Sequence, residues 1–167
     1  MNLVFSIQYT FIGTILVLIL LITGCNEKQA HEMINQTDVQ LLGRFIKLPL
    51  KPERVKFDVR TLGVEGGIGP TDTEVFAVLE YSSSNFDKVI KLIKASAPTW
   101  ESGDYELQPS NWFNVSELPD NVVSENTMTI KATALQSAEP FFSSPYLNGV
   151  VIPLKKLNTI LIVLFTS

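Results

Sequence analysis

The N-terminal stretch carries no charged residue, and this limits how much of the chain belongs to a folded core. All 13 basic and 17 acidic residues fall at or after Glu27, while residues 3–22 are mostly Leu, Ile, Val and Phe. An apolar run of this kind is typical of a targeting or membrane segment, and it is excluded from the fold of the soluble part. The rest of the 167-residue chain has the length of one domain.

The only cysteine lies where this apolar run ends. The segment Ile22-Thr23-Gly24-Cys25 resembles the lipobox of bacterial prolipoproteins, in which an aliphatic residue, a small residue and Gly or Ala precede an obligatory cysteine. The resemblance covers residues 1–25 only. It implies cleavage between Gly24 and Cys25 and acylation of Cys25, which would bind the protein to the lipid bilayer. One acyl chain binds a membrane only marginally, whereas two or more hold it firmly.

Two alternatives remain for the same segment. Twenty residues span roughly 30 Å as a helix, which is enough for an uncleaved transmembrane anchor in the inner membrane. An ordinary secretory signal would leave Cys25 as a free thiol. The n-region, Met1-Asn2, lacks the Lys or Arg that signal peptides usually carry. The lipobox resemblance favours a lipid-anchored protein of the bacterial cell envelope. In Gram-negative lipoproteins, Asp directly after the cysteine favours retention in the inner membrane. This chain has Asn26 at that position, so the resemblance points to the outer membrane.

The sequence divides the chain into three parts. Residues 1–24 are the predicted lipoprotein signal peptide. Residues 25–39 are the lipidated cysteine and a flexible tether, because residues 26–39 are polar and show no periodicity. The only histidine, His31, lies in this tether. Residues 40–167 are predicted to form a single globular α+β domain.

Four segments have the pattern of β-strands. Residues 54–60 and 127–133 alternate apolar and polar side chains, which predicts antiparallel strands with one face in water. Residues 73–81 and 159–165 are apolar on both faces and are predicted to be central strands that are covered on both sides.

One segment is clearly helical. In residues 82–96, Phe86, Val89, Ile90 and Ile93 follow the spacing i, i+3, i+4, i+7, with Ser84 as the expected N-cap and Asp87 three residues later. We predict an α+β fold: a mostly antiparallel sheet of about six strands with one main helix packed on it. The alternative is a β-sandwich with a helical insertion.

The turn residues predict two hairpins. Residues 63–72, GVEGGIGPTD, carry four glycines and a proline between two predicted strands. They are expected to be a hairpin connection, and the alternative is a ligand-binding loop. Asn148-Gly149 is a strong hairpin signal.

Residues 97–126 are predicted to be an irregular excursion with one short strand near Tyr105. Trp100, Trp112 and Phe113 form a candidate interaction surface, because aromatic residues dominate interface hot spots. The alternative is that these aromatic side chains cover the edge or the face of the sheet.

Charge excludes one class of partner and is unevenly distributed. The net charge of −4 argues against a nucleic-acid binder, which needs a basic excess. Residues 44–60 have a net charge of +4 and residues 101–139 a net charge of −6, so these segments either create a dipolar surface or neutralise each other across the sheet.

One cysteine cannot build a multi-cysteine metal site. We expect neither a metal nor a cofactor.

Catalytic motifs are missing from the sequence. It has no GxSxG, SxxK, HExxH or dinucleotide-binding pattern, and Asp72 and Glu74 are its best carboxylate pair. We therefore expect no enzyme but an envelope lipoprotein that presents a small binding or scaffolding domain to an envelope protein partner, with an inhibitor or immunity factor as a special case. The alternative is an envelope hydrolase or small-ligand carrier that uses the Gly-rich loop 63–72 and the adjacent acids.

Overall fold

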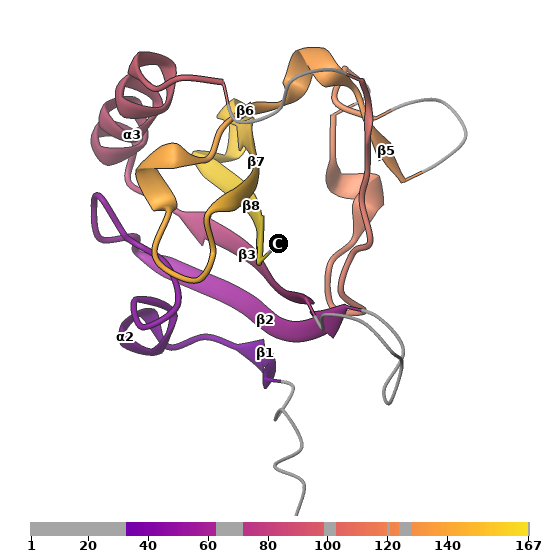
Figure 1. Cartoon of the computed structure of the whole chain (residues 1–167). Helices are drawn as coiled ribbons and strands as arrows, with labels where there is room; N and C mark the ends of the chain where they lie inside the picture. Colours follow the sequence, from indigo (N-terminus) through magenta and orange to yellow (C-terminus); the bar gives the residue numbers. More distant parts are fainter. Residues whose placement is uncertain (1–32, 63–71, 99–102, 120, 124–127, 167) are drawn as a thin grey trace, which may run out of the picture. The chain divides into compact units, whose positions relative to one another are not determined.

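A six-stranded antiparallel sheet organises the domain (Figure 1). The computed structural model describes residues 33–62, 72–98, 103–119, 121–123 and 128–166. The strands of the sheet, in spatial order, are β1 (Met33–Gln36), β2 (Arg54–Leu62), β3 (Asp72–Glu80), β8 (Thr159–Phe165), β7 (Asn148–Leu154) and β6 (Gln136–Ser137). A separate two-stranded sheet pairs β4 (Tyr105–Glu106) with β5 (Thr129–Ile130).

The described helical elements are mostly short. They are α2 (Val39–Leu42), the main helix α3 (Ser83–Ala95), and the 3₁₀ turns η1 (Val115–Glu117), η2 (Ala132–Ala134), η3 (Glu139–Phe141) and η4 (Lys155–Leu157). The predicted α+β fold, a mostly antiparallel sheet with one main helix, is confirmed. Among the described helices none is long and apolar enough to cross a membrane. The predicted signal segment, with Gly24 and Cys25, lies outside the described residues.

The domain begins earlier than the sequence suggests. The sequence assigns residues 33–39 to the tether, but β1 pairs with β2 through Met33 opposite Val59 and Gln36 opposite Phe57. The ladder is irregular between these two pairs, and Asn35 has a positive φ of 56°. This bulged geometry explains why no strand periodicity is visible in the segment. The tether is therefore shorter by this strand.

The two strands predicted to be covered on both faces, β3 and β8, are neighbours in the middle of the sheet. On one face Val75, Ala77 and Leu79 of β3 lie in the same core as Ile160, Ile162 and Leu164 of β8. On the other face Phe76 of β3 joins a second core with Leu161 and Val163 of β8. Two cores, one on each side of the sheet, explain why residues 75–79 of β3 and 160–165 of β8 are apolar on both faces.

Helix α3 covers the first face. Phe86, Val89 and Ile93 are buried in the core under it, and Ile90 is half-buried at its margin. The predicted apolar stripe is thus confirmed, but the predicted cap is wrong. Ser82 is the N-cap, and its hydroxyl accepts a hydrogen bond from the Asn85 N–H at 3.4 Å. The helix begins one residue before Ser84, so Ser84 lies inside the first turn.

The described residues between 103 and 135 form a layer on the second face, opposite α3 (Figure 1). This layer corrects two predictions. The polar face of β2, expected to be in water, is covered, and Asp58 on that face is only 4% exposed. The strand expected at 127–133 is limited to β5, because Asp104 accepts the Ala132 N–H at 2.8 Å and the chain turns there into η2.

The hairpins also differ in part from the sequence-based prediction. β2 and β3 pair along their whole length up to Leu62 opposite Asp72, so the Gly-rich segment does connect a hairpin, although residues 63–71 themselves lie outside the described part. Asn148-Gly149 is not a turn, because both residues lie in β7 and pair with β8. The reversal between β7 and β8 occurs at η4 and Asn158, which has a φ of 49°.

Candidate functional site

The aromatic residues that the sequence singled out lie on the second face of the sheet. The ring centroids of Trp112 and Phe113 are 5.5 and 5.3 Å from that of Phe76, both in edge-to-face geometry. Both side chains are half-buried in the second core. This arrangement corresponds to the alternative in which the aromatic residues cover the sheet. Trp100, the third member of the candidate interaction surface, lies outside the described residues.

Asp58 is the polar centre beneath Trp112. Its Oδ1 accepts the indole Nε1–H of Trp112 at 2.6 Å and the backbone N–H of Asn35 at 2.5 Å. The Nζ of Lys56 lies 4.8 Å from the centroid of the Trp112 ring. One buried carboxylate therefore connects β1, β2 and the layer that covers the sheet. Because this buried carboxylate accepts hydrogen bonds from both layers, it is suited to holding them together.

We expect Trp112→Phe to destabilise the domain by about 1–3 kcal/mol, because Asp58 would lose a charge-assisted hydrogen bond while staying buried. Urea denaturation of the purified protein measures this difference. Phe113→Leu is the control: it removes aromatic packing on Phe76 but no hydrogen bond to Asp58. An equal or greater loss in the control would show that packing, and not the bond to Asp58, makes Trp112 important.

Glu74, one of the two candidate catalytic acids, is an ion-pair partner of Arg60. The Nε of Arg60 donates to Glu74 Oε1 at 2.7 Å, and the Nη2 of Arg60 forms a salt bridge with the same oxygen and donates to the Gln108 carbonyl. Burial raises the pKa of Glu74 above its ordinary value, and the adjacent Arg60 opposes this shift. Burial, together with the charge of Glu74, raises the pKa of Tyr105 to about 12.

Glu74 and Asp72 differ in their surroundings. Glu74 is only 4% exposed and is held by Arg60, whereas Asp72 is half-buried at the start of β3, opposite Leu62. Two acids that share a cleft are the minimum for glycosidase-type chemistry. The carboxylate of Glu74 faces Arg60 and the covering layer, so this arrangement supports a structural role for Glu74.

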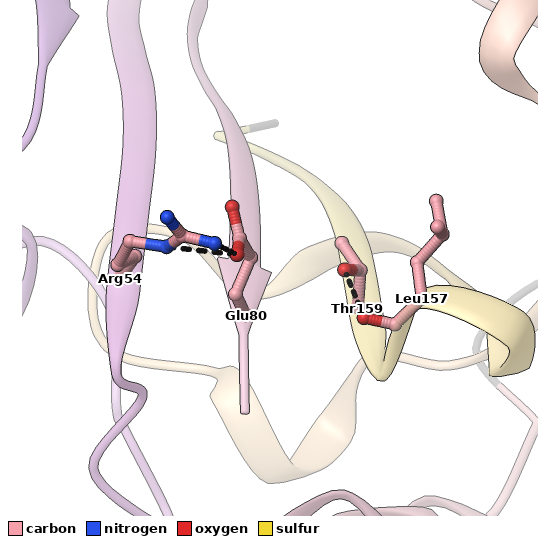
Figure 2. A network of polar contacts seen from close by, with 4 residues as sticks. All are labelled: Arg54, Glu80, Leu157 and Thr159. Carbon is pink, nitrogen blue, oxygen red and sulfur yellow. Dashed lines mark hydrogen bonds and ion pairs between the residues drawn. The ribbon is translucent and has the colours of Figure 1, made fainter. Parts of the chain in front are cut away.

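The basic segment 44–60 pairs partly with acids on the neighbouring strand. Arg54 and Glu80 are directly opposite each other in the β2–β3 ladder, and the Nε of Arg54 donates to Glu80 Oε2 at 2.9 Å (Figure 2). Arg60 and Glu74 are opposite each other in the same way. Both pairs use acids of β3, outside the acidic segment 101–139. Figure 2 also shows the Thr159 hydroxyl, which donates to the Leu157 carbonyl at 3.0 Å and closes the β7–β8 turn.

A groove of about 450 Å³ lies beside the end of β7 and the C-terminal half of α3. Three parts of the fold line it: the last turns of α3, the described parts of residues 119–136 in the covering layer and at the start of β6, and the end of β7 with η4. Its apolar floor is mostly buried, with Ile93 at 2%, Val122 at 4% and Leu154 at 4% exposure. Sites of this size and composition typically bind small molecules or anchor side chains.

The charged residues of this groove all have the same sign. Lys94, Lys155 and Lys156 line it and are exposed, and the described lining contains no Asp or Glu. Within the described part of the chain none of the three lysines forms a salt bridge. The polar lining residues Asn121, Thr133 and Gln136 add neutral hydrogen-bonding groups. The groove is thus suited to an anion that also carries apolar surface.

A second hollow of about 310 Å³ adjoins this groove. It shares Ile93, Lys94 and Gln136 with the groove and is otherwise lined by Ser96, Pro98, Leu135 and Ser137. We refer to the first hollow alone as the lysine groove. In the part of the chain that can be described, no group of three His, Cys, Asp or Glu side chains is placed to hold a metal ion.

Sequence reasoning missed the lysine groove because its residues come from three distant segments. The three lysines are spread over residues 94–156, and only the fold brings α3 next to the end of β7. The one local signal was the adjacent pair Lys155-Lys156 beside an apolar strand. Comparison with family models, with curated proteins and with solved structures finds no match for this chain.

Proposed function

We propose that the chain is a lipid-anchored, non-catalytic binding protein of the bacterial cell envelope, and that the lysine groove is its binding site. The observation that carries the proposal is the groove itself: a mostly buried apolar floor with three exposed lysines that have no salt-bridge partner among the described residues. A binding partner would therefore present negative charge beside an apolar surface.

The anchor part of the proposal rests on the lipobox resemblance of Ile22-Thr23-Gly24-Cys25. Because β1 begins at Met33, only residues 26–32 would link an acylated Cys25 to the domain. A link of that length spans at most about 25 Å when fully extended. The binding site would then act close to the bilayer surface, where envelope proteins and lipids are both concentrated.

The mass of the N-terminal peptide of the mature protein tests the anchor. We expect a peptide that starts at Cys25 and carries the mass of a diacylglyceryl group. A Cys25→Ser variant should release the protein from washed membranes. An intact Met1 with an unmodified thiol would contradict the anchor and favour an uncleaved N-terminal helix.

Crosslinking in native membranes tests the binding role. We expect a crosslinked partner, either a protein or a small molecule, whose capture is lost when Lys94, Lys155 and Lys156 are all changed to Gln. The matched control changes Lys51, Lys88 and Lys91, which are exposed and do not line the groove, so the net charge falls by the same amount. Equal capture by both variants would remove the groove from the proposal.

The alternative function, a hydrolase or ligand carrier that uses the Gly-rich loop 63–72, has less support. Of its two acids, Glu74 already forms a hydrogen bond and a salt bridge with Arg60. An Asp72→Asn variant that kept full biological activity would remove the remaining carboxylate from consideration.

A further inference from the structure

We propose that the ligand of the lysine groove is a free amphiphilic anion, a small molecule with an apolar body and a carboxylate or phosphate head. The proposal rests on the proposed binding function and specifies the chemistry of the ligand. The apolar body would lie on Ile93, Val122 and Leu154, and the head would face Lys94, Lys155 and Lys156.

The first argument is electrostatic. Three positive charges from two segments face one hollow, and the described lining contains no acid to neutralise them. Helix α3 ends at Ala95, next to Lys94, and the helix dipole contributes about half a negative charge at this end of the helix. The three lysines outweigh this contribution, so the charges of the described lining favour an anion.

The second argument is that the floor is apolar and already formed. Ile93, Val122 and Leu154 belong to the two cores of the sheet and are almost fully buried, so they are held in place without a ligand. Ile90 is half-buried and extends the floor along α3. A preformed apolar floor favours a ligand with hydrocarbon, because the ligand buries its surface without ordering the protein.

The third argument concerns the edge of the sheet beside the groove. β6 pairs with only Val150 and Val151 of β7, so in the described structure no strand covers the edge from Ile152 to Leu154. Pro153 lies in this stretch and has no N–H for an added strand. The edge therefore binds an extended peptide poorly. This favours a small amphiphile over a segment of a protein partner.

Equilibrium dialysis with radiolabelled octanoate tests the proposal. The mature, membrane-anchored protein is held in phosphatidylcholine nanodiscs, and binding to empty nanodiscs is subtracted. We expect saturable binding of octanoate and at least tenfold weaker binding of octanol, which has the same apolar body without the charge. Raising the salt concentration should weaken octanoate binding, because the lysines are exposed.

Two variants locate the binding in the groove. Changing Lys94, Lys155 and Lys156 to Gln should weaken octanoate binding about tenfold, since each exposed ion pair contributes a few-fold. The control with Gln at positions 51, 88 and 91 should bind as the parent does. Thr133→Trp keeps all three lysines and fills the hollow from an exposed position, and it should abolish binding while the protein stays folded.

Several results would overturn the proposal. One is octanoate binding no stronger than to empty nanodiscs, and another is equal binding by both lysine variants. Binding of hexaglutamate in place of octanoate would show that the groove serves an acidic protein segment. Loss of octanoate binding in nanodiscs with phosphatidylglycerol would show that a membrane headgroup occupies the groove. In each case, an acylated Cys25 with groove-dependent partner capture would leave the proposed function intact.

Discussion

Changing Gly149 to Ala should destabilise the domain by about 3 kcal/mol or more. Gly149 lies in β7 with a φ of 144°, a backbone conformation that residues with a Cβ rarely adopt. A Cβ at this position would also collide with the Val163 carbonyl oxygen and approach the Leu164 Cα to 2.8 Å. These atoms belong to β8, in the middle of the sheet, and cannot move aside without disturbing the pairing. Backbone strain and overpacking each cost about 1–3 kcal/mol.

Urea denaturation measures this loss, and Gly103→Ala is the matched control. Gly103 also has a positive φ, 86°, but a Cβ there meets no atom within 4 Å. The control therefore carries the conformational strain without the collision and should cost about 1 kcal/mol. If both variants lost the same stability, the close approach of β7 and β8 at Gly149 would not be the reason for the glycine.

Changing Arg60 to Met should cost about 3–5 kcal/mol, because it leaves the carboxylate of Glu74 buried without its cation. The side chains of Arg60 and Glu74 are 19% and 5% exposed. The control is Arg54→Met: Arg54 and Glu80 form the same kind of cross-strand pair, but their side chains are 77% and 39% exposed. Water screens that pair, so its loss should cost less than about 1 kcal/mol.

The double variant Arg60→Met with Glu74→Leu separates the two causes of the loss. It removes the buried charge together with its partner, so most of the stability should return. A double variant as unstable as Arg60→Met alone would show that Arg60 acts mainly through its bond to the Gln108 carbonyl. Equal losses for Arg60→Met and Arg54→Met would contradict the special cost of the buried pair.

The effect of Arg60→Met should also depend on pH. Burial raises the pKa of Glu74 in the folded state above 4.5, so the folded protein holds this proton more tightly than the unfolded chain does. The contribution of Glu74 to the free energy of unfolding is therefore full below about pH 4.5 and falls as pH rises through the raised pKa. Without Arg60 the pKa rises further. The stability gap between Arg60→Met and the parent should be smaller at pH 4 than at pH 7.

The sequence predicted the elements whose pattern is local. β3 and β8 are apolar on both faces because the sheet has a core on each side, and α3 has its stripe at Phe86, Val89 and Ile93. In each case the periodicity records which side chains are buried. The α+β class followed from these elements, and the short strand expected near Tyr105 in the irregular excursion is β4.

The sequence failed where a residue's role depends on a distant partner. Asn148-Gly149 has the composition of a hairpin turn, but Gly149 is needed because β8 approaches it closely. The alternation in β2 correctly predicted a strand but not its environment, because Trp112 covers Asp58 from more than fifty residues away.

The candidate site likewise depends on contacts between distant segments rather than on a local pattern. Side-chain patterns along single segments predicted β2, β3, β8 and α3 and the two-sided burial of β3 and β8, but they missed β1, whose ladder is irregular. The lysine groove depends on packing, which places the end of α3, the described parts of residues 119–136 and the end of β7 around one hollow. No local pattern encodes that arrangement, because burial of the two cores, and not any contact among the lysines, brings those segments together.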